Sequence, residues 1–186
     1  MNAHVNRQLP GQSRQGAVSV LQTERLVLSR LSYDDCEFIV ELVNEPSFKR
    51  YIGDKNVSTP GDARRYLRDG PIGSYERFGY GLFSVCPKDS GSPAGICGLV
   101  KRQEFDDPDI GFAFLERYRG TGYALESAKA VLNYGFAELG LQRIIAMADA
   151  DNEASVRLLA RLELEFERVV RLPGEDHDIN LYAIEK

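Results

Sequence analysis

The residues with the clearest capacity for chemistry lie in the segment Arg117-Tyr-Arg-Gly-Thr-Gly-Tyr-Ala124. A predicted strand runs into this segment and a predicted amphipathic helix runs out of it. The first N–H groups of a helix lack backbone partners and carry partial positive charge. Gly120 and Gly122 allow positive φ and a close approach of the backbone to a ligand, and Arg117 and Arg119 add positive charge. The pattern predicts a site for a phosphate or pyrophosphate.

Two common nucleotide motifs do not fit this segment. A nucleoside-triphosphate loop requires Gly-Lys-Ser/Thr after four spacer residues. A dinucleotide fingerprint requires a third glycine within an N-terminal βαβ unit. A glycine-containing turn that binds no ligand is the alternative interpretation, and the rest of the sequence decides between the two.

Hydrophobic periodicity predicts the elements that must position this segment. Four helices are expected, two of them starting at Ser32 and Thr59 and two covering 122–139 and 153–162. Pro46 is expected to stop the first helix, and Gly70-Pro71 the second. The sum is a mixed α/β domain with a single twisted, mostly antiparallel sheet of about six to seven strands. The predicted strands cover 23–30, 80–85, 94–101, 109–115, 143–148, 164–171 and 179–184.

Composition limits the possible partners. The 186 residues suffice for one domain, and a net charge of −5 argues against nucleic acid or an anionic membrane as the main partner. The three cysteines lack C-x-x-C spacing and read as reduced thiols. With only two histidines, a histidine-based triad or metal site is not expected.

The chain is expected to be a cytoplasmic protein of one domain. No apolar run approaches the ~18 residues of a membrane span, and the first residues lack the apolar region of a signal peptide. Residues 1–18 are predicted to be a disordered lead, and residues 19–186 the domain.

Four features occur in order along the chain: Thr23-Glu-Arg-Leu, strand 109–115 leading into Arg117-x-x-Gly-x-Gly122, the strand Gln142-Arg-Ile-Ile, and Asn152-x-x-Ser155-x-x-Leu-Leu159. With these features the chain, from Thr23 to about Ile184, resembles the GNAT family of N-acetyltransferases. The branch that it most resembles acetylates the N-termini of ribosomal proteins. The resemblance implies the GNAT fold and direct transfer of an acetyl group from acetyl-CoA to a primary amine in a ternary complex.

The resemblance also implies roles for individual residues. The strand ending Phe114-Leu115 would pair with the pantetheine arm of coenzyme A, and Asn152 would contact the same arm. A backbone N–H near Phe114 or Leu115 would stabilise the oxygen that gains charge during transfer, a contribution worth about 3–4 kcal/mol in other enzymes. No metal and no covalent intermediate are implied. The pyrophosphate would lie on the amides of Arg117, Tyr118, Arg119, Gly120, Thr121, Gly122, Tyr123 and Ala124.

The chain departs from the family pattern at two positions. Many members protonate the leaving thiolate with a tyrosine, where this chain has Leu159, so Ser155 is the substitute that we expect. Alternatively, Ser155 is a core residue whose hydroxyl bonds the carbonyl four residues back. Glu163 replaces a glycine, and a positive φ there would cost about 1 kcal/mol or more.

Proton removal from the amine and the choice of acceptor stay open. Asp109 and Glu104 are candidate bases, since burial raises a carboxylate pKa toward neutrality. Alternatively, Asp109 only opens its strand, Glu104 is a solvated charge, and a water chain takes the proton. Acceptor contacts are expected from 48–53, Tyr75 and Glu76. The acceptor would be a protein N-terminus or a small molecule, and a non-catalytic acetyl-CoA-binding module is the alternative function.

Overall fold

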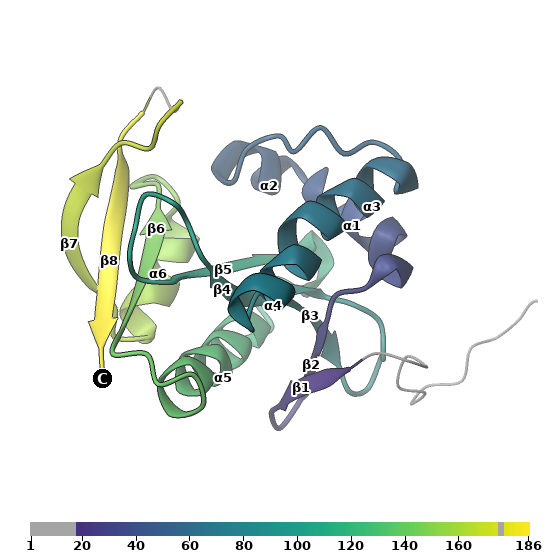
Figure 1. Cartoon of the computed structure of the whole chain (residues 1–186), viewed down its shortest axis with the longest axis horizontal. Coiled ribbons are helices and arrows are strands. Elements are labelled where there is room, and N and C mark those ends of the chain that lie inside the picture. Colours follow the sequence, from purple (N-terminus) through teal and green to yellow (C-terminus); the bar gives the residue numbers. More distant parts are fainter. Residues whose placement is uncertain (1–17, 175–176) are drawn as a thin grey trace, which may run out of the picture.

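The architecture is one eight-stranded sheet with helices on both faces (Figure 1). It is seen in a computed structural model that describes residues 18–174 and 177–186, so the predicted lead lies, except for Val18, outside the described residues. The strand order is β1-β2-β3-β4-β5-β6-β8-β7. The strands are β1 (Ser19–Gln22), β2 (Leu26–Arg30), β3 (Leu82–Pro87), β4 (Gly95–Val100), β5 (Asp109–Phe114), β6 (Arg143–Ala148), β7 (Glu165–Val170) and β8 (Ile179–Glu185).

The mixed α/β prediction is confirmed, with one strand more than expected. The seven predicted strands correspond to β2–β8. The additional β1 forms an antiparallel hairpin with β2 at the edge of the sheet. It has only four residues, too few to show a clear alternation of polar and apolar side chains.

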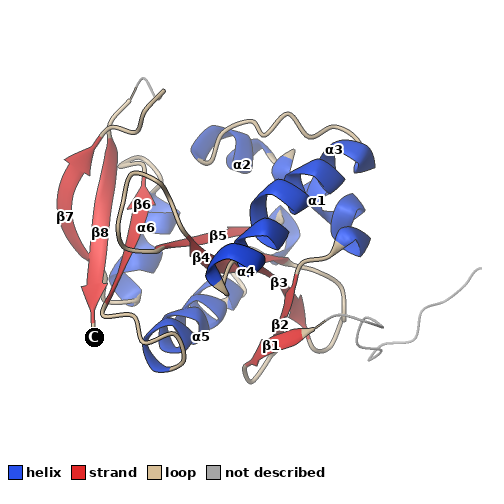
Figure 2. Cartoon of the chain, viewed as in Figure 1, coloured by secondary structure: helices blue, strands red, loops and turns tan. Residues whose placement is uncertain are grey.

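Six α-helices in the described part of the chain flank the sheet (Figure 2). Pro46 was expected only to stop a helix, but it also occupies the first turn of the next one, where a missing N–H has no cost. The predicted stop at Gly70-Pro71 is wrong, because a π-helical segment over Arg68–Ile72 carries the chain into a further helix. The helices are α1 (Cys36–Val43), α2 (Pro46–Tyr51), α3 (Pro60–Leu67), α4 (Gly73–Phe78), α5 (Tyr123–Ala137) and α6 (Glu153–Arg161).

Two apolar clusters, one on each face of the sheet, fix the helices. On one face, α5 and α6 pack on a cluster that includes Phe83, Ile110 and Ile144. On the other face, α1 and α3 pack on a cluster that includes Ile96 and Leu115. Of the described residues, no helix is long and apolar enough to cross a membrane.

The feature that creates a site is the divergence of β5 from β6. These two strands form the single parallel pair of the sheet and are in register only at Asp109 and Ile145. On its other side, β6 pairs with β8 over six positions. Beyond Asp109 the two strands separate (Figure 1), so the edge of β5 that faces β6 is open to other partners.

Candidate active site

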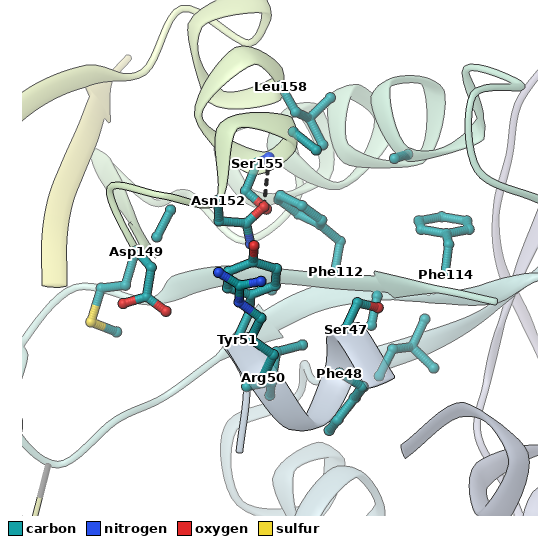
Figure 3. A pocket seen from close by; sticks show the side chains of 18 of the residues that line it. Ser47, Phe48, Arg50, Tyr51, Phe112, Phe114, Asp149, Asn152, Ser155 and Leu158 are labelled. Carbon is teal, nitrogen blue, oxygen red and sulfur yellow. Dashed lines mark hydrogen bonds between the residues drawn. The ribbon is translucent and has the colours of Figure 1, made fainter. Parts of the chain in front are cut away.

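A cavity of about 1140 Å³ occupies the region where β5 and β6 diverge. Figure 3 shows residues of α2 on one side of β5 and Asn152, Ser155 and Leu158 on the other. We name its two parts by their linings. The glycine-loop side is lined by Gly120, Gly122, Tyr123, Asn152 and Ser155, and the α2 side by Tyr51, Tyr66, Leu82, Val100, Arg102 and Gly111.

The glycine loop has the backbone conformation that the sequence predicts. Gly120 and Gly122 have φ values of +75° and +86°, a region that other residues rarely adopt. Gly122 immediately precedes the first residue of α5, so the unpaired N–H groups of this helix begin at the cavity wall. This arrangement can hold an anionic group by backbone amides and the helix dipole.

The two arginines of the loop, expected to add positive charge at the loop, both form ion pairs within the protein. Arg117 forms an ion pair with Glu41 of α1, with Nη1 2.5 Å from Oε1. Arg119 pairs with Glu45 at 3.0 Å, and its guanidinium also donates two 3.0 Å hydrogen bonds to the carbonyl of Phe114. Both side chains therefore tie the loop to α1 and β5.

Sequence reasoning assigned no role to Arg25, which supports the same loop. Its Nη1 donates to the carbonyl of Thr121 at 3.0 Å, and its Nε donates to Glu126 at 2.7 Å. The Thr23 hydroxyl also donates to Glu126, at 2.5 Å. Glu126 lies in the first turn of α5. The Thr23-Glu-Arg-Leu motif thus anchors the N-terminus of α5. This motif was the signal in the sequence that could have pointed to a role for Arg25.

Asn152 and Ser155 begin α6 at the cavity. The side-chain oxygen of Asn152 accepts a 3.2 Å hydrogen bond from the Ser155 N–H, so Asn152 is the N-cap of the helix. The Ser155 hydroxyl makes no hydrogen bond within the described part of the chain, and its side chain lies at the cavity (Figure 3). The alternative bond to the carbonyl four residues back is therefore not formed. Leu159 is buried in the core, with 1% of its surface exposed.

The two candidate bases are not brought together. Asp109 lines the cavity with its side chain only 4% exposed, and Arg102 Nε donates to its Oδ2 at 2.6 Å. Burial raises the pKa of Asp109, while Arg102 and the Met147 N–H lower it, and burial dominates. Glu104 is exposed and lines a separate hollow beside Arg143 and Glu167.

The structure also distinguishes between the two expected amide donors. The Leu115 N–H already donates to the carbonyl of Ala94 at 3.0 Å, and Leu115 is fully buried. As a donor to a ligand, Leu115 is therefore a wrong prediction. Phe114 lies at the cavity wall and is the remaining candidate (Figure 3).

Comparison with known proteins identifies the family to which this arrangement belongs. A family model described as an acetyltransferase (GNAT) domain matches residues 25–165, more than half of the chain. The chain belongs to the GNAT acetyltransferase family. The GNAT fold expected from the sequence is thereby confirmed, and the open edge of β5 and the glycine loop lie within the matched residues.

Individual GNAT relatives cover nearly the whole chain. The uncharacterized N-acetyltransferase YoaA of Bacillus subtilis is 30% identical over 172 residues, which are 90% of this chain and 97% of YoaA. A GNAT acetyltransferase structure from Bacillus anthracis has a TM-score of 0.74 and 27% identity, covering 88% of this chain and 96% of its own. RimL, a ribosomal L7/L12 α-N-protein acetyltransferase solved with coenzyme A, shares the fold, with a TM-score of 0.73 at 20% identity over 88% of this chain and 95% of its own.

The structure also shows where three further groups of residues singled out in the sequence lie in this GNAT domain. Residues 48–53, from which acceptor contacts are expected, line the cavity. Tyr75 does not, because its ring is buried and its hydroxyl bonds the Leu31 N–H and the Leu82 carbonyl. Glu163 has a φ of +64°, so the glycine that the family pattern has there is replaced by a residue in a strained conformation. The described residues contain no group of three or more His, Cys, Asp or Glu that could hold a metal.

Proposed function

We propose that this GNAT domain binds acetyl-CoA in the cavity and transfers its acetyl group to a primary amine by direct attack in a ternary complex. The observation that carries the proposal is the meeting of the open β5 edge, the glycine loop and the start of α6 at one cavity. RimL, which has the same fold, is known in complex with coenzyme A. Acetyl-CoA supplies the activated acetyl group, and the chain supplies binding, orientation and proton transfer.

The glycine-loop side suits the cofactor. The amides from Arg119 to Ala124 would hold the diphosphate, since this loop lines the cavity and leads into the N-terminus of α5. The open edge of β5 would pair with the amide groups of the pantetheine arm as an added strand does. The Phe114 N–H would stabilise the acetyl oxygen as negative charge develops on it. Asn152 would contact the arm through its side-chain N–H groups, because its oxygen caps α6.

Ser155 is proposed as the acid that protonates the leaving sulfur. Its hydroxyl has no partner within the described chain and lies at the cavity, in the first turn of α6. The partial positive charge of this helix end would also stabilise a thiolate. Ser155 would therefore act as the acid in place of the family tyrosine, because Leu159, which occupies the tyrosine position, is buried and has no polar side-chain atom.

Proton removal from the attacking amine is proposed to use water in the cavity. Glu104 lies at a different hollow, and the Asp109 carboxylate is held by Arg102 and the Met147 N–H. If this is right, Asp109→Asn leaves the pH dependence of kcat/KM unchanged. A lost acidic limb in that variant would instead assign the base to Asp109.

The direct test is acetylation of a panel of acceptors. Purified protein is incubated with acetyl-CoA and with small amines or N-terminal peptides, including that of ribosomal protein L7/L12, and acetylated products are detected by mass spectrometry. Acetylation of one class is expected, and acetylation of the peptide would support the narrower ribosomal-protein prediction. If acetyl-CoA binds but no acceptor is modified, the chain is a non-catalytic binding module and the proposal fails.

A further inference from the structure

The floor of the α2 side is apolar and contains a gap at Gly111. Gly111 lies opposite Gly98 in the sheet, and Gly98 lies opposite Leu82, so the three form a row across β5, β4 and β3. A Cβ atom at Gly111 would be 3.5 Å from Leu82 Cδ2 and 3.8 Å from Val100 Cγ2, which are ordinary contacts. The fold therefore has room for a Cβ atom at Gly111. The glycine leaves this room to the cavity.

Arg102 lies at one end of this floor. It follows Val100 by two residues, and Val100 is in register with Asp109, with which Arg102 forms its ion pair. The Asp109 carboxylate is almost fully buried and holds the guanidinium by Nε alone, at 2.6 Å. The two terminal nitrogens of Arg102 have no partner within the described chain, and the side chain is 38% exposed at the cavity.

The cations that α2 contributes to the cavity are already paired. Lys49 lies 3.4 Å from Asp54, and Arg50 lies 2.7 Å from Asp151. Arg102 differs from them because its partner is buried beneath it and its outer edge is free. Such an edge presents two parallel N–H donors, which match the two oxygens of a carboxylate.

We propose that the acceptor is a small amine that also carries a carboxylate, as an amino acid does, and that Arg102 binds this carboxylate. The proposal rests on the proposed acetyl transfer and names its acceptor class. The apolar part of the acceptor would lie over Gly111, between Leu82 and Val100. Arg102 would be a specificity-determining residue, and Asp109 would position it.

The charge of the site favours a carboxylate over a phosphate. Arg102 carries a single positive charge, and Asp109 already offsets part of it. The site therefore suits the one negative charge of a carboxylate better than a phosphate, which carries almost two negative charges near neutral pH. The cavity favours a small molecule over a polypeptide, because an ion pair connects its two sides. Arg50 of α2 and Asp151, in the turn before α6, both line the cavity and form an ion pair that joins its two sides (Figure 3 shows Arg50).

The test compares acceptors that differ only in the carboxylate. Acetylation by the wild-type protein is measured for the twenty common L-amino acids and for their decarboxylated amines, such as L-phenylalanine and 2-phenylethylamine, with phosphoethanolamine as the phosphate arm. Arg102→Gln and Arg102→Lys are compared with Arg68→Gln. Arg68 forms an exposed ion pair with Asp69 and lies away from the cavity lining, so it is a matched control.

The expected result is a preference of at least about tenfold in kcat/KM for the carboxylate-bearing member of a pair, because a built polar site rejects an analogue that lacks its partner. Arg102→Gln should reduce this preference to within about threefold of unity and leave the Kd of acetyl-CoA unchanged. Arg102→Lys should retain part of it, since charge remains without the fork.

A second readout does not depend on turnover. Butyrate, added to the protein in complex with coenzyme A, should shift the NMR signal of Arg102 Nε saturably, and Arg102→Gln should lose butyrate binding. Three results would overturn the inference. They are equal kcat/KM for an amino acid and its decarboxylated amine in every pair, a preference for phosphoethanolamine, and an unchanged preference for the carboxylate in Arg102→Gln. So would the absence of both butyrate binding and amino-acid acetylation. Acetylation of other amines would then leave the proposed function intact, and failure to bind acetyl-CoA would contradict that function itself.

Discussion

Arg25, in the turn before β2, forms an ion pair of 2.7 Å with Glu126, in the first turn of α5. The two residues are 101 positions apart in the sequence. The guanidinium of Arg25 also lies 4.9 Å from the centre of the Tyr123 ring and bonds the carbonyl of Thr121. One arginine therefore fixes both the glycine loop and the helix that follows it.

Loss of this anchor should weaken cofactor binding more than it weakens the fold. Arg25 is 46% exposed, and ion pairs at such sites contribute about 0–1 kcal/mol to stability. Arg25→Gln and Glu126→Gln should each raise the Kd of acetyl-CoA several-fold in calorimetry while the Tm changes little, because the loop amides lose their fixed direction. Unchanged affinity in both variants would show that the loop keeps its shape without the anchor.

The two glycines of the loop should differ in their tolerance of alanine. At Gly122 a Cβ would lie 3.2 Å from Arg25 Nη2, whereas at Gly120 nothing lies within 4 Å. Both have positive φ, which costs an alanine about 1–2 kcal/mol. Gly122→Ala, which adds the close contact with Arg25 to this strain, should lower acetyl-CoA affinity at least tenfold and Gly120→Ala by less. The prediction fails if the order is reversed in the same titration.

Removal of the Ser155 hydroxyl should slow the chemical step. Ser155→Ala should lower kcat by about 10²-fold, the lower end for a lost general acid, with the Kd of acetyl-CoA unchanged. Ser90→Ala, in an exposed loop, is the matched control. Full activity in Ser155→Ala would remove this residue from the mechanism.

Glu163 should be a site of simple stabilisation. It follows α6 at the position where the Leu164 N–H bonds the carbonyl of Leu159 and the Glu163 N–H bonds that of Ala160. Glycine at this position would remove about 1–2 kcal/mol of backbone strain from the folded state. It would also make the unfolded chain more flexible, which costs about 0.5–1 kcal/mol on folding. Glu163→Gly should therefore raise the free energy of unfolding by about 0.5–1 kcal/mol in urea titrations. A decrease would show that the left-handed conformation is not costly here.

Filling the gap at Gly111 should weaken acceptor binding and leave the stability of the fold nearly unchanged. Gly111→Val should raise the acceptor KM about tenfold, in line with about 1–3 kcal/mol for filling an occupied space, while the Tm and acetyl-CoA affinity stay near wild type. Gly98→Ala is the contrast, since its Cβ would lie 2.1 Å from the carbonyl oxygen of Gly81 and should destabilise the protein. An unchanged KM in Gly111→Val would place the acceptor elsewhere.

Local patterns in the sequence were sufficient to predict most of the elements. The caps at Ser32 and Thr59, the glycine loop and the amphipathic α5 are short-range features, and the structure has all of them. The continuation through Pro71 was missed, because a π-helical turn that accommodates a proline has no clear local signature. The positive φ of Glu163 could be suspected only because the family pattern has glycine there.

Partnerships across long sequence separations could not be predicted in the same way. The pairing of Arg117 and Arg119 with Glu41 and Glu45 links residues more than seventy positions apart. Charge alone indicated phosphate contacts for these arginines, and only the packing of α1 beside the loop shows that their carboxylate partners are in the protein. Asp109 likewise could be placed at the start of its strand, but its contact with Arg102 depends on the turn after β4.

The central claim is that the open edge of β5 and the glycine loop bind acetyl-CoA. Isothermal titration of the purified protein with acetyl-CoA tests it most directly, with Gly122→Ala measured beside the wild type. The account predicts one saturable site per chain, competed by coenzyme A and weakened at least tenfold in the variant. No detectable heat or competition with either ligand, from a protein shown to be folded, would contradict it.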